Sequence, residues 1–161
     1  MMMSEGVVLG HFISANGILV DPSKIRVIEN IPTPETQEEV RILLGHARYY
    51  RIFIENFSKL ASPLLTLLMK DVQFAWNDAC QTTFTELNNR LSIDPISRGP
   101  NWALPFHISS DAFDTTIGAV LGQHDGQTPY AILYISKNLS PAELNYTVTE
   151  KEFLAIVYSM L

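Results

Sequence analysis

The chain has 161 residues and a formal net charge of −6, and 47% of its residues are hydrophobic. This length suits one ordinary domain or two small ones, and the apolar content is enough for a packed core rather than wholesale disorder. A negative charge counts against autonomous binding to nucleic acid, because non-specific binding rests mainly on Lys and Arg at phosphates.

The number of cysteines and the length of the apolar runs indicate where in or outside the cell the protein would be found. The single cysteine, Cys80, excludes an internal disulfide and a cysteine-based metal site. The sequence has no apolar run near the roughly 20 residues that a membrane span needs, and residues 1–5 lack the features of a signal peptide. We therefore expect an intracellular protein, cytoplasmic or nuclear, that is not secreted.

The first predicted element is a β-hairpin. Residues 7–13 and 18–20 are rich in β-forming residues, and Asn16-Gly17 lies between them. Asn-Gly between two apolar runs is a strong signal for a tight turn, because both residues tolerate positive φ. A simple loop is the alternative.

Residues 21 to 70 predict a small helical bundle. Asp21-Pro22 is typical of a helix start, and Thr36 with Glu39 fits a capping box that precedes apolar positions at helical spacing. This pattern continues in an aromatic stripe at i, i+4 and i+8, which favours core packing over base stacking. The stripe consists of Tyr49, Phe53 and Phe57.

A further helix is expected after Asn77, which would cap it and bury Cys80 as a small core residue. The helical pattern breaks at Asp94-Pro95 and Arg98-Gly99-Pro100. We therefore predict two units, residues 1–95 and residues 96–161.

The second unit has a strand pattern followed by one helix. Strands are expected around residues 106–110, 117–121 and 130–136, joined by short turns as in an antiparallel meander. Thr147 and Glu150 fit a second capping box. The fold class predicted from the whole pattern is α+β.

Two carboxylates of the second unit are candidates for metal chemistry. Asp111 lies at the end of the first strand, and Glu152 lies in the first turns of the helix. Carboxylates on packed neighbouring elements can hold Mg²⁺, and two such ions can assist phosphodiester hydrolysis. The ordinary alternatives are a turn or cap for Asp111 and a helix-dipole partner for Glu152.

Several motifs occur in order along nearly the whole chain, and their ordered succession is more specific than any one of them. They are residues 5–11 and 17–25, Leu44-Gly45-His46 with Tyr49-Tyr50-Arg51 and Phe53-Ile54, Ser110-Asp111-Ala112 with 117–121, and residues 150–157. This succession resembles the Pol polyprotein of gypsy-type long-terminal-repeat retrotransposons. The first unit resembles the thumb and connection of the reverse transcriptase, and the second resembles the N-terminal half of its RNase H-like domain.

The resemblance implies a fold and a set of functional residues. It implies a β-hairpin and a small helical bundle, then a half domain of three antiparallel strands and one helix. It assigns Asp111 and Glu152 as the first two of four acidic Mg²⁺ ligands, and therefore as catalytic residues. It makes Arg48, Arg51 and Lys59 candidate contacts to the backbone of a template–primer duplex or an RNA–DNA hybrid.

The resemblance also implies what the chain lacks. The third and fourth acidic ligands would lie beyond Leu161, and the polymerase active site would lie before Met1. We therefore expect a fragment that is inactive by itself, although its parent makes DNA from RNA and cleaves the RNA of the hybrid. The alternative is a domesticated, non-catalytic module for protein interaction, with possible self-association through an open sheet edge.

Overall fold

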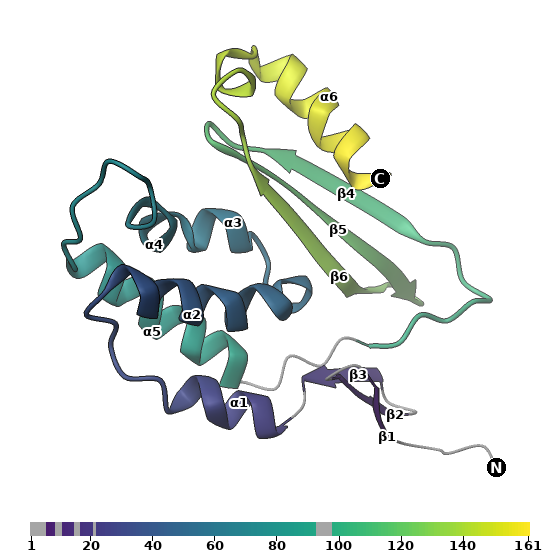
Figure 1. Cartoon of the computed structure of the whole chain (residues 1–161). Coiled ribbons are helices and arrows are strands. Elements are labelled where there is room, and N and C mark those ends of the chain that lie inside the picture. The colour runs from purple at the N-terminus through teal and green to yellow at the C-terminus, as the bar shows by residue number, and fades with distance from the viewer. Residues whose placement is uncertain (1–5, 9–10, 15–16, 21, 93–97) are drawn as a thin grey trace.

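The computed structural model describes residues 6–8, 11–14, 17–20, 22–92 and 98–161 (Figure 1). The described part consists of a small N-terminal sheet, a block of helices, and a second sheet with one helix beside it. Within these residues, no helix is both long and apolar enough to cross a membrane.

The N-terminal sheet has three antiparallel strands: β1 (Gly6–Val8), β2 (His11–Ser14) and β3 (Gly17–Val20). Ser14 pairs with Gly17, so β2 and β3 form the predicted hairpin. Asn16 of the expected turn lies outside the described residues. The single strand expected over residues 7–13 is two strands, β1 and β2, because Val8 pairs with His11.

The predicted helical bundle is confirmed. It contains α1 (Pro22–Glu29), α2 (Gln37–Tyr49), the 3₁₀ turn η1 (Arg51–Phe53), α3 (Phe57–Leu60), α4 (Ser62–Thr66) and α5 (Asp78–Ser92). The expected cap at Asp21 lies outside the described residues. The capping box of α2 is present: the Glu39 N–H donates to Thr36 Oγ1 at 3.2 Å, and the Glu39 carboxylate accepts from the Thr36 N–H at 3.2 Å.

Among the described residues, the helices enclose an apolar core with sixteen buried residues. The predicted cap of α5 is confirmed, because Asn77 Oδ1 accepts from the Cys80 N–H at 3.0 Å. Cys80 is 1% exposed and packs in this core, as expected of a small apolar residue.

The aromatic stripe is only partly in the core. Phe57 is buried and Phe53 is half-buried, but Tyr49 is 48% exposed, so the prediction of core packing was wrong for Tyr49. The reason is that Tyr49 lies on the exposed side of α2, opposite the buried positions of that helix, and that η1 breaks the helical spacing before Phe53 and Phe57.

The second unit contains β4 (His107–Ala112), β5 (Thr116–Asp125), β6 (Thr128–Asn138), the 3₁₀ turn η2 (Glu143–Asn145) and α6 (Val148–Ser159). The strands are antiparallel in the order β4-β5-β6, which confirms the predicted meander and the α+β class. The second capping box, Thr147 with Glu150, starts α6.

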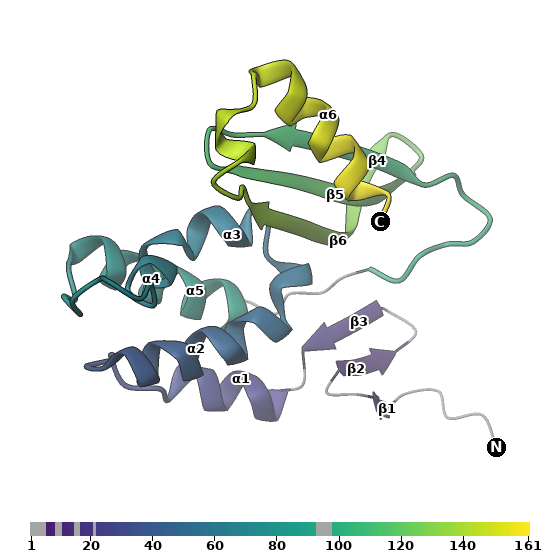
Figure 2. The ribbon, with the colours of Figure 1, turned by 45° about the horizontal axis from the view of Figure 1, so that its top comes forward.

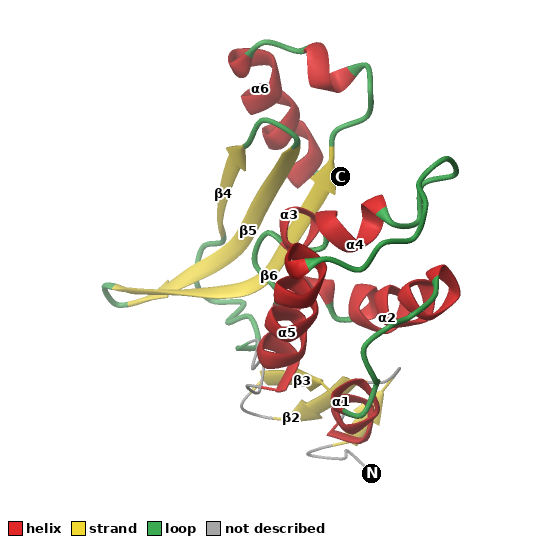
Figure 3. Cartoon of the chain, turned by 90° about the vertical axis from the view of Figure 1, so that its left-hand side faces the viewer, coloured by secondary structure: helices red, strands yellow, loops and turns green. Residues whose placement is uncertain are grey.

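The two faces of this sheet have different neighbours, because successive side chains of a strand point to opposite faces. On one face, Ala112 and Ile117 pack with Ala155 of α6. The other face carries Gly118 and Ser136, which approach the helical block. The sheet therefore lies between α6 and the helical block, with β4 near α6 and β6 near α3 (Figures 1 and 3).

A hydroxyl contact joins the helical block to β6. The Ser58 N–H donates to Ser136 Oγ at 2.9 Å, and the Ser136 hydroxyl donates to Ser58 Oγ at 3.1 Å. Next to it, Asn56 adopts a left-handed conformation with φ 53° and ψ 36°, which Asn tolerates better than most residues. A Cβ atom on Gly118 would lie 2.9 Å from Asn56 Oδ1, so the glycine permits the close approach.

The loop that leads into β4 is held by a buried glutamine. Gln123 is 1% exposed, and its amide accepts from the Asn101 N–H and donates to the Asn101 and Leu104 carbonyls at 2.8 to 3.0 Å. The Tyr130 hydroxyl also donates to it at 2.7 Å. Polar contacts to Asn101 and Leu104 therefore hold the loop that leads into β4.

The two units are expected to differ in stability. The apolar cluster beneath α6 has three buried residues, against sixteen in the helical block, and among the described strands β4 pairs only with β5. Native-state hydrogen exchange should therefore show faster exchange at Ile108 and Asp111 than at Leu43 and Leu87. Equal protection at the two sets of amides would contradict this difference.

Candidate catalytic and nucleic-acid-binding sites

Asp111 lies one residue before the end of β4, opposite Gly118 of β5, and its side chain is exposed. It lines a cavity of about 210 Å³ between the sheet and the helical block. Glu55, Asn56 and Tyr134 line the same cavity. The structure therefore brings a second carboxylate near Asp111 that the sequence did not indicate, because Glu55 is far from it along the chain.

The hydroxyl of Tyr134 has its pKa shifted by its position in this cavity. Burial raises the pKa of its hydroxyl, and the Glu55 carboxylate raises it further, whereas Arg90 lowers it. Burial and the Glu55 carboxylate both disfavour a negative charge on the phenol. Tyr134 is therefore a neutral wall of the cavity.

Glu152 is half-buried in the second turn of α6, which packs against β4 and β5 (Figure 2). The described residues that line the Asp111 cavity include none from α6. Glu150, two residues before Glu152, belongs to the capping box of α6, and hydrogen bonds from Thr147 lower the pKa of the Glu150 carboxyl. The assignment of Glu150 to the cap is therefore confirmed.

The fit of these residues to a metal ion is partial. Carboxylate oxygens are the donors that Mg²⁺ prefers, so the chemistry of Asp111 and Glu152 is suitable. Among the residues that the structure describes, however, no group of three or more His, Cys, Asp or Glu side chains could hold a metal ion. Asp111 lines a cavity on the face of the sheet toward the helical block, whereas α6, which carries Glu152, packs on the other face, so no described contact brings the two carboxylates together.

The three basic candidates have different surroundings. Arg48 is exposed in the last turn of α2, and Arg51 is half-buried in η1. Lys59 is exposed on α3, with Nζ 4.0 Å from the centre of the Phe113 ring. Lys59 therefore makes a cation–π contact between the helical block and the second unit, besides any contact to a ligand.

The exposed side of α2 has one feature that the sequence did not single out as a site. Gly45 lies inside the helix and is exposed, and a Cβ atom there would meet no described atom within 4 Å apart from its chain neighbours and the backbone of its own helix. Ile42, which is 51% exposed, and Tyr49 lie three and four residues away and share its side of the helix. A glycine inside a predicted helix was the available signal for this surface.

His107 and His124 are seventeen residues apart in the sequence but come together in the structure. In the sheet, their rings lie edge to face with their centres 4.6 Å apart. The contact crosses from β4 to β5, so linear spacing could not show it. His46, by contrast, is half-buried in α2.

Comparison with known proteins identifies the class. Residues 76–161 match the family described as the RNase H-like domain found in reverse transcriptase, and the chain belongs to this family. The match begins just before α5, although α5 packs in the core of the helical block. The boundary near residue 95 therefore stays a prediction.

Curated relatives place the chain among retrotransposon Pol polyproteins. It is 36% identical over 163 residues to the Pol polyprotein of transposon opus and 35% identical over 164 residues to that of transposon gypsy, both from Drosophila melanogaster. It is 34% identical to the transposon Tf2-3 polyprotein of Schizosaccharomyces pombe. Each match covers 94% of this chain but only 12 to 16% of the relative.

Solved structures confirm the fold. The foamy viral protease-reverse transcriptase in complex with RNA/DNA hybrid matches 99% of this chain with a TM-score of 0.82 and 23% sequence identity. The same protein in complex with double-stranded DNA matches with a TM-score of 0.80. The match covers 22 to 34% of those chains.

The connection between β6 and α6 depends on an ion pair and should respond to pH. Lys137 Nζ donates to Glu143 Oε1 at 2.6 Å, and together with bonds from Ser140 it lowers the pKa of the Glu143 carboxyl to about 2. A lowered folded-state pKa contributes stability that is present above the unfolded value, near 4.5, and is lost as the pH falls toward 2.

Glu143→Gln should therefore unfold at a lower urea concentration than the unsubstituted chain at pH 7. The difference should shrink below pH 4.5 and approach zero near pH 2. Urea denaturation at pH 7 and pH 3 measures this, with Asp71→Asn at an exposed position as the control. A difference of the same size at both pH values would show that the ion pair is not its source.

Proposed function

We propose that the helical block holds duplex nucleic acid, as a template–primer duplex or an RNA–DNA hybrid, on the exposed side of α2. The observation that carries this proposal is Gly45. Glycine inside a helix is less favourable than alanine by about 1 kcal/mol, and no neighbour among the described residues requires it here. A glycine in that position lets a ligand backbone approach the helix closely.

The residues around Gly45 suit a sugar–phosphate backbone. Ile42 and Tyr49 offer exposed apolar and aromatic surface, and Arg48 adds a cation in the same region. Arg51 and Lys59 extend the positive charge along the block. The fold shared with a foamy viral protein solved on an RNA/DNA hybrid supports this ligand class, and synthesis of DNA on RNA belongs to the proposed parent protein. The intracellular location expected above agrees with such a parent.

Gly45→Ala separates stability from binding. Because a Cβ atom fits without contact, the substitution should raise the free energy of unfolding by roughly 0.5 to 1 kcal/mol. It should also weaken binding of an RNA–DNA hybrid, measured by fluorescence anisotropy, because the added methyl group meets the ligand. Thr85→Ala, at an exposed position of α5, is the control. A stabilised Gly45→Ala chain with unchanged affinity would contradict the proposed surface.

We further propose that Asp111 and Glu152 hold a divalent cation as part of an RNase H-type site. The family generally uses divalent metal, and the two carboxylates have suitable donor atoms. The bound ions would activate water and stabilise the leaving oxygen during hydrolysis of RNA in a hybrid. Asp111 would supply an exposed ligand from β4, and Glu152 a half-buried one from α6.

Paramagnetic broadening by Mn²⁺ tests this site. We expect Mn²⁺ to broaden the amide signals near Asp111 and Glu152, and Asp111→Asn to weaken that effect at least tenfold in Mn²⁺ concentration. Asp114→Asn, three residues away, should keep it. Broadening that is unchanged in Asp111→Asn would rule out Asp111 as a ligand. With two carboxylates we expect no cleavage of the hybrid, and cleavage lost in Asp111→Asn would overturn that expectation.

A second candidate function is protein interaction through β4. Among the described strands, its outer edge has no partner, and Ile108 is 50% exposed beside it. Phe153, Ile156 and Val157 add exposed apolar surface on α6. A second copy could pair antiparallel along this edge. Sedimentation equilibrium should then show a dimer that Ile108→Lys abolishes, and a monomer at high concentration would exclude it.

A further inference from the structure

We propose that the turn between β4 and β5 is a second contact for a nucleic-acid backbone, with Lys59 on one side and Lys151 on the other. This inference rests on the proposed binding of duplex nucleic acid, and it names a part of the ligand path that lies outside α2. The ligand is the phosphodiester backbone, which is the same in every sequence, so the contact gives affinity and position rather than sequence preference.

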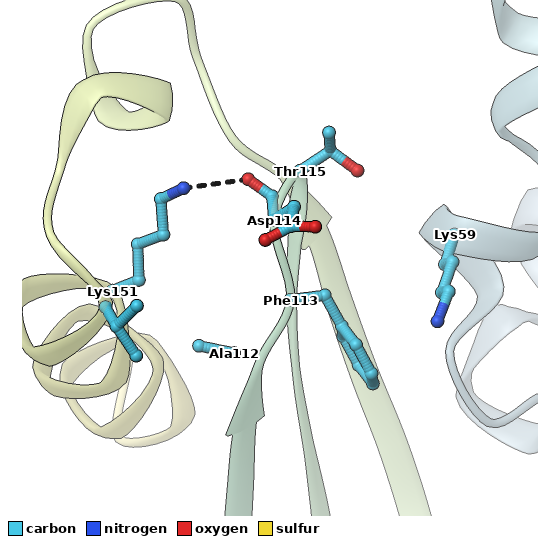
Figure 4. Close-up of a pocket in the computed structure, with 7 residues that line it drawn as sticks. Lys59, Ala112, Phe113, Asp114, Thr115 and Lys151 are labelled. Carbon is cyan, nitrogen blue, oxygen red and sulfur yellow. Dashed lines mark hydrogen bonds between the residues drawn. The ribbon is translucent and has the colours of Figure 1, made fainter.

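The turn borders a cavity of about 460 Å³ where three parts of the structure meet. Lys59 comes from α3, Phe113 and Thr115 come from the turn, and Val148 and Lys151 come from the start of α6. Figure 4 shows the two lysines on opposite sides of Phe113 and Asp114. A strand that crossed the turn would therefore meet an ammonium group on each side.

Neither lysine is neutralised by a carboxylate contact that the structure describes. Lys151 Nζ donates to the main-chain oxygen of Asp114 at 2.8 Å, which is an uncharged acceptor and leaves further N–H donors available. Lys59 Nζ lies over the Phe113 ring, which orients the ammonium group without cancelling its charge. The ion pairs among the described residues involve other cations.

One carboxylate opposes this attraction. Asp114 also lines the cavity, so the two lysines and this aspartate give the lining a formal charge of +1. Glu150 at the start of α6 is occupied by the capping box and is not among the lining residues. Removal of the Asp114 charge should therefore strengthen binding, which is a change that misfolding would not produce.

The position of the turn connects it to the carboxylates. Ala112 lines the cavity and follows Asp111 directly, and Lys151 directly precedes Glu152. The turn therefore follows the strand that carries Asp111 and lies against the start of the helix that carries Glu152, although neither carboxylate lines this cavity. Lys59 belongs to the helical block, so the same strand would also be tied to the part of the chain that carries α2.

The salt dependence of binding tests the proposal on the whole chain. A labelled RNA–DNA hybrid of about 20 base pairs is titrated at several salt concentrations. Each phosphate contact to a duplex contributes about 0.9 to the slope of log K against log salt. Lys59→Gln and Lys151→Gln should each make the negative slope shallower by about 0.9, and the double variant should make it shallower by about 1.8. Lys70→Gln, an exposed lysine outside this cavity, should not change it.

Asp114→Asn provides the opposite test, with at least a twofold gain in affinity expected. An unchanged slope in the double variant, or no gain in Asp114→Asn, would overturn this proposal. If Arg48→Ala weakens binding at the same time, only the contact at the turn is wrong. If the unsubstituted chain does not bind the hybrid even at low salt, the proposed function fails together with it.

Discussion

Asn56 and Gly118 meet at the contact that fixes the second sheet against the helical block. The left-handed backbone of Asn56 starts α3, and the missing side chain of Gly118 leaves room for the asparagine. The hydroxyl groups of Ser58 and Ser136 then pair across the same interface. Small and polar groups make this contact, so it depends on close geometry more than on buried apolar area.

This contact determines which residues share a surface. It places Asp111 in a cavity with Glu55, and it places Lys59 over Phe113, so that the helical block borders the candidate metal ligands. A nucleic-acid duplex bound on α2 and a nucleic-acid strand that crosses the turn after β4 can then belong to the same bound ligand. The functional proposals depend on this fixed orientation, because neither unit carries the complete path.

Local signals in the sequence predicted much of the fold. Both capping boxes, the cap at Asn77, the buried Cys80 and the meander follow from residue types at short spacing. Tyr49 was assigned to the core because its spacing suits a continuous helix, but the helix ends there. A short 3₁₀ turn has no strong signal of its own, so the break could not be predicted.

The candidate sites were predicted less completely than the fold. Asp111 and Glu152 came from a resemblance to a family, because an isolated carboxylate at a strand end or in a first helical turn has ordinary structural roles. Glu55 beside Asp111 and His107 beside His124 depend on contacts between distant segments. The buried Gln123 likewise finds its partners in a separate loop. No local pattern encodes such pairings.

The contact at Asn56 and Gly118 should make the helical block and the second sheet move as one rigid body. Nitrogen-15 relaxation of the chain in solution measures the rotational correlation time of each part separately. Amides of α2 and α5 should give the same correlation time as amides of β5 and β6, because the contact at Asn56 and Gly118 holds the units together. Two clearly different correlation times would show that the units tumble independently and that this contact does not hold them together.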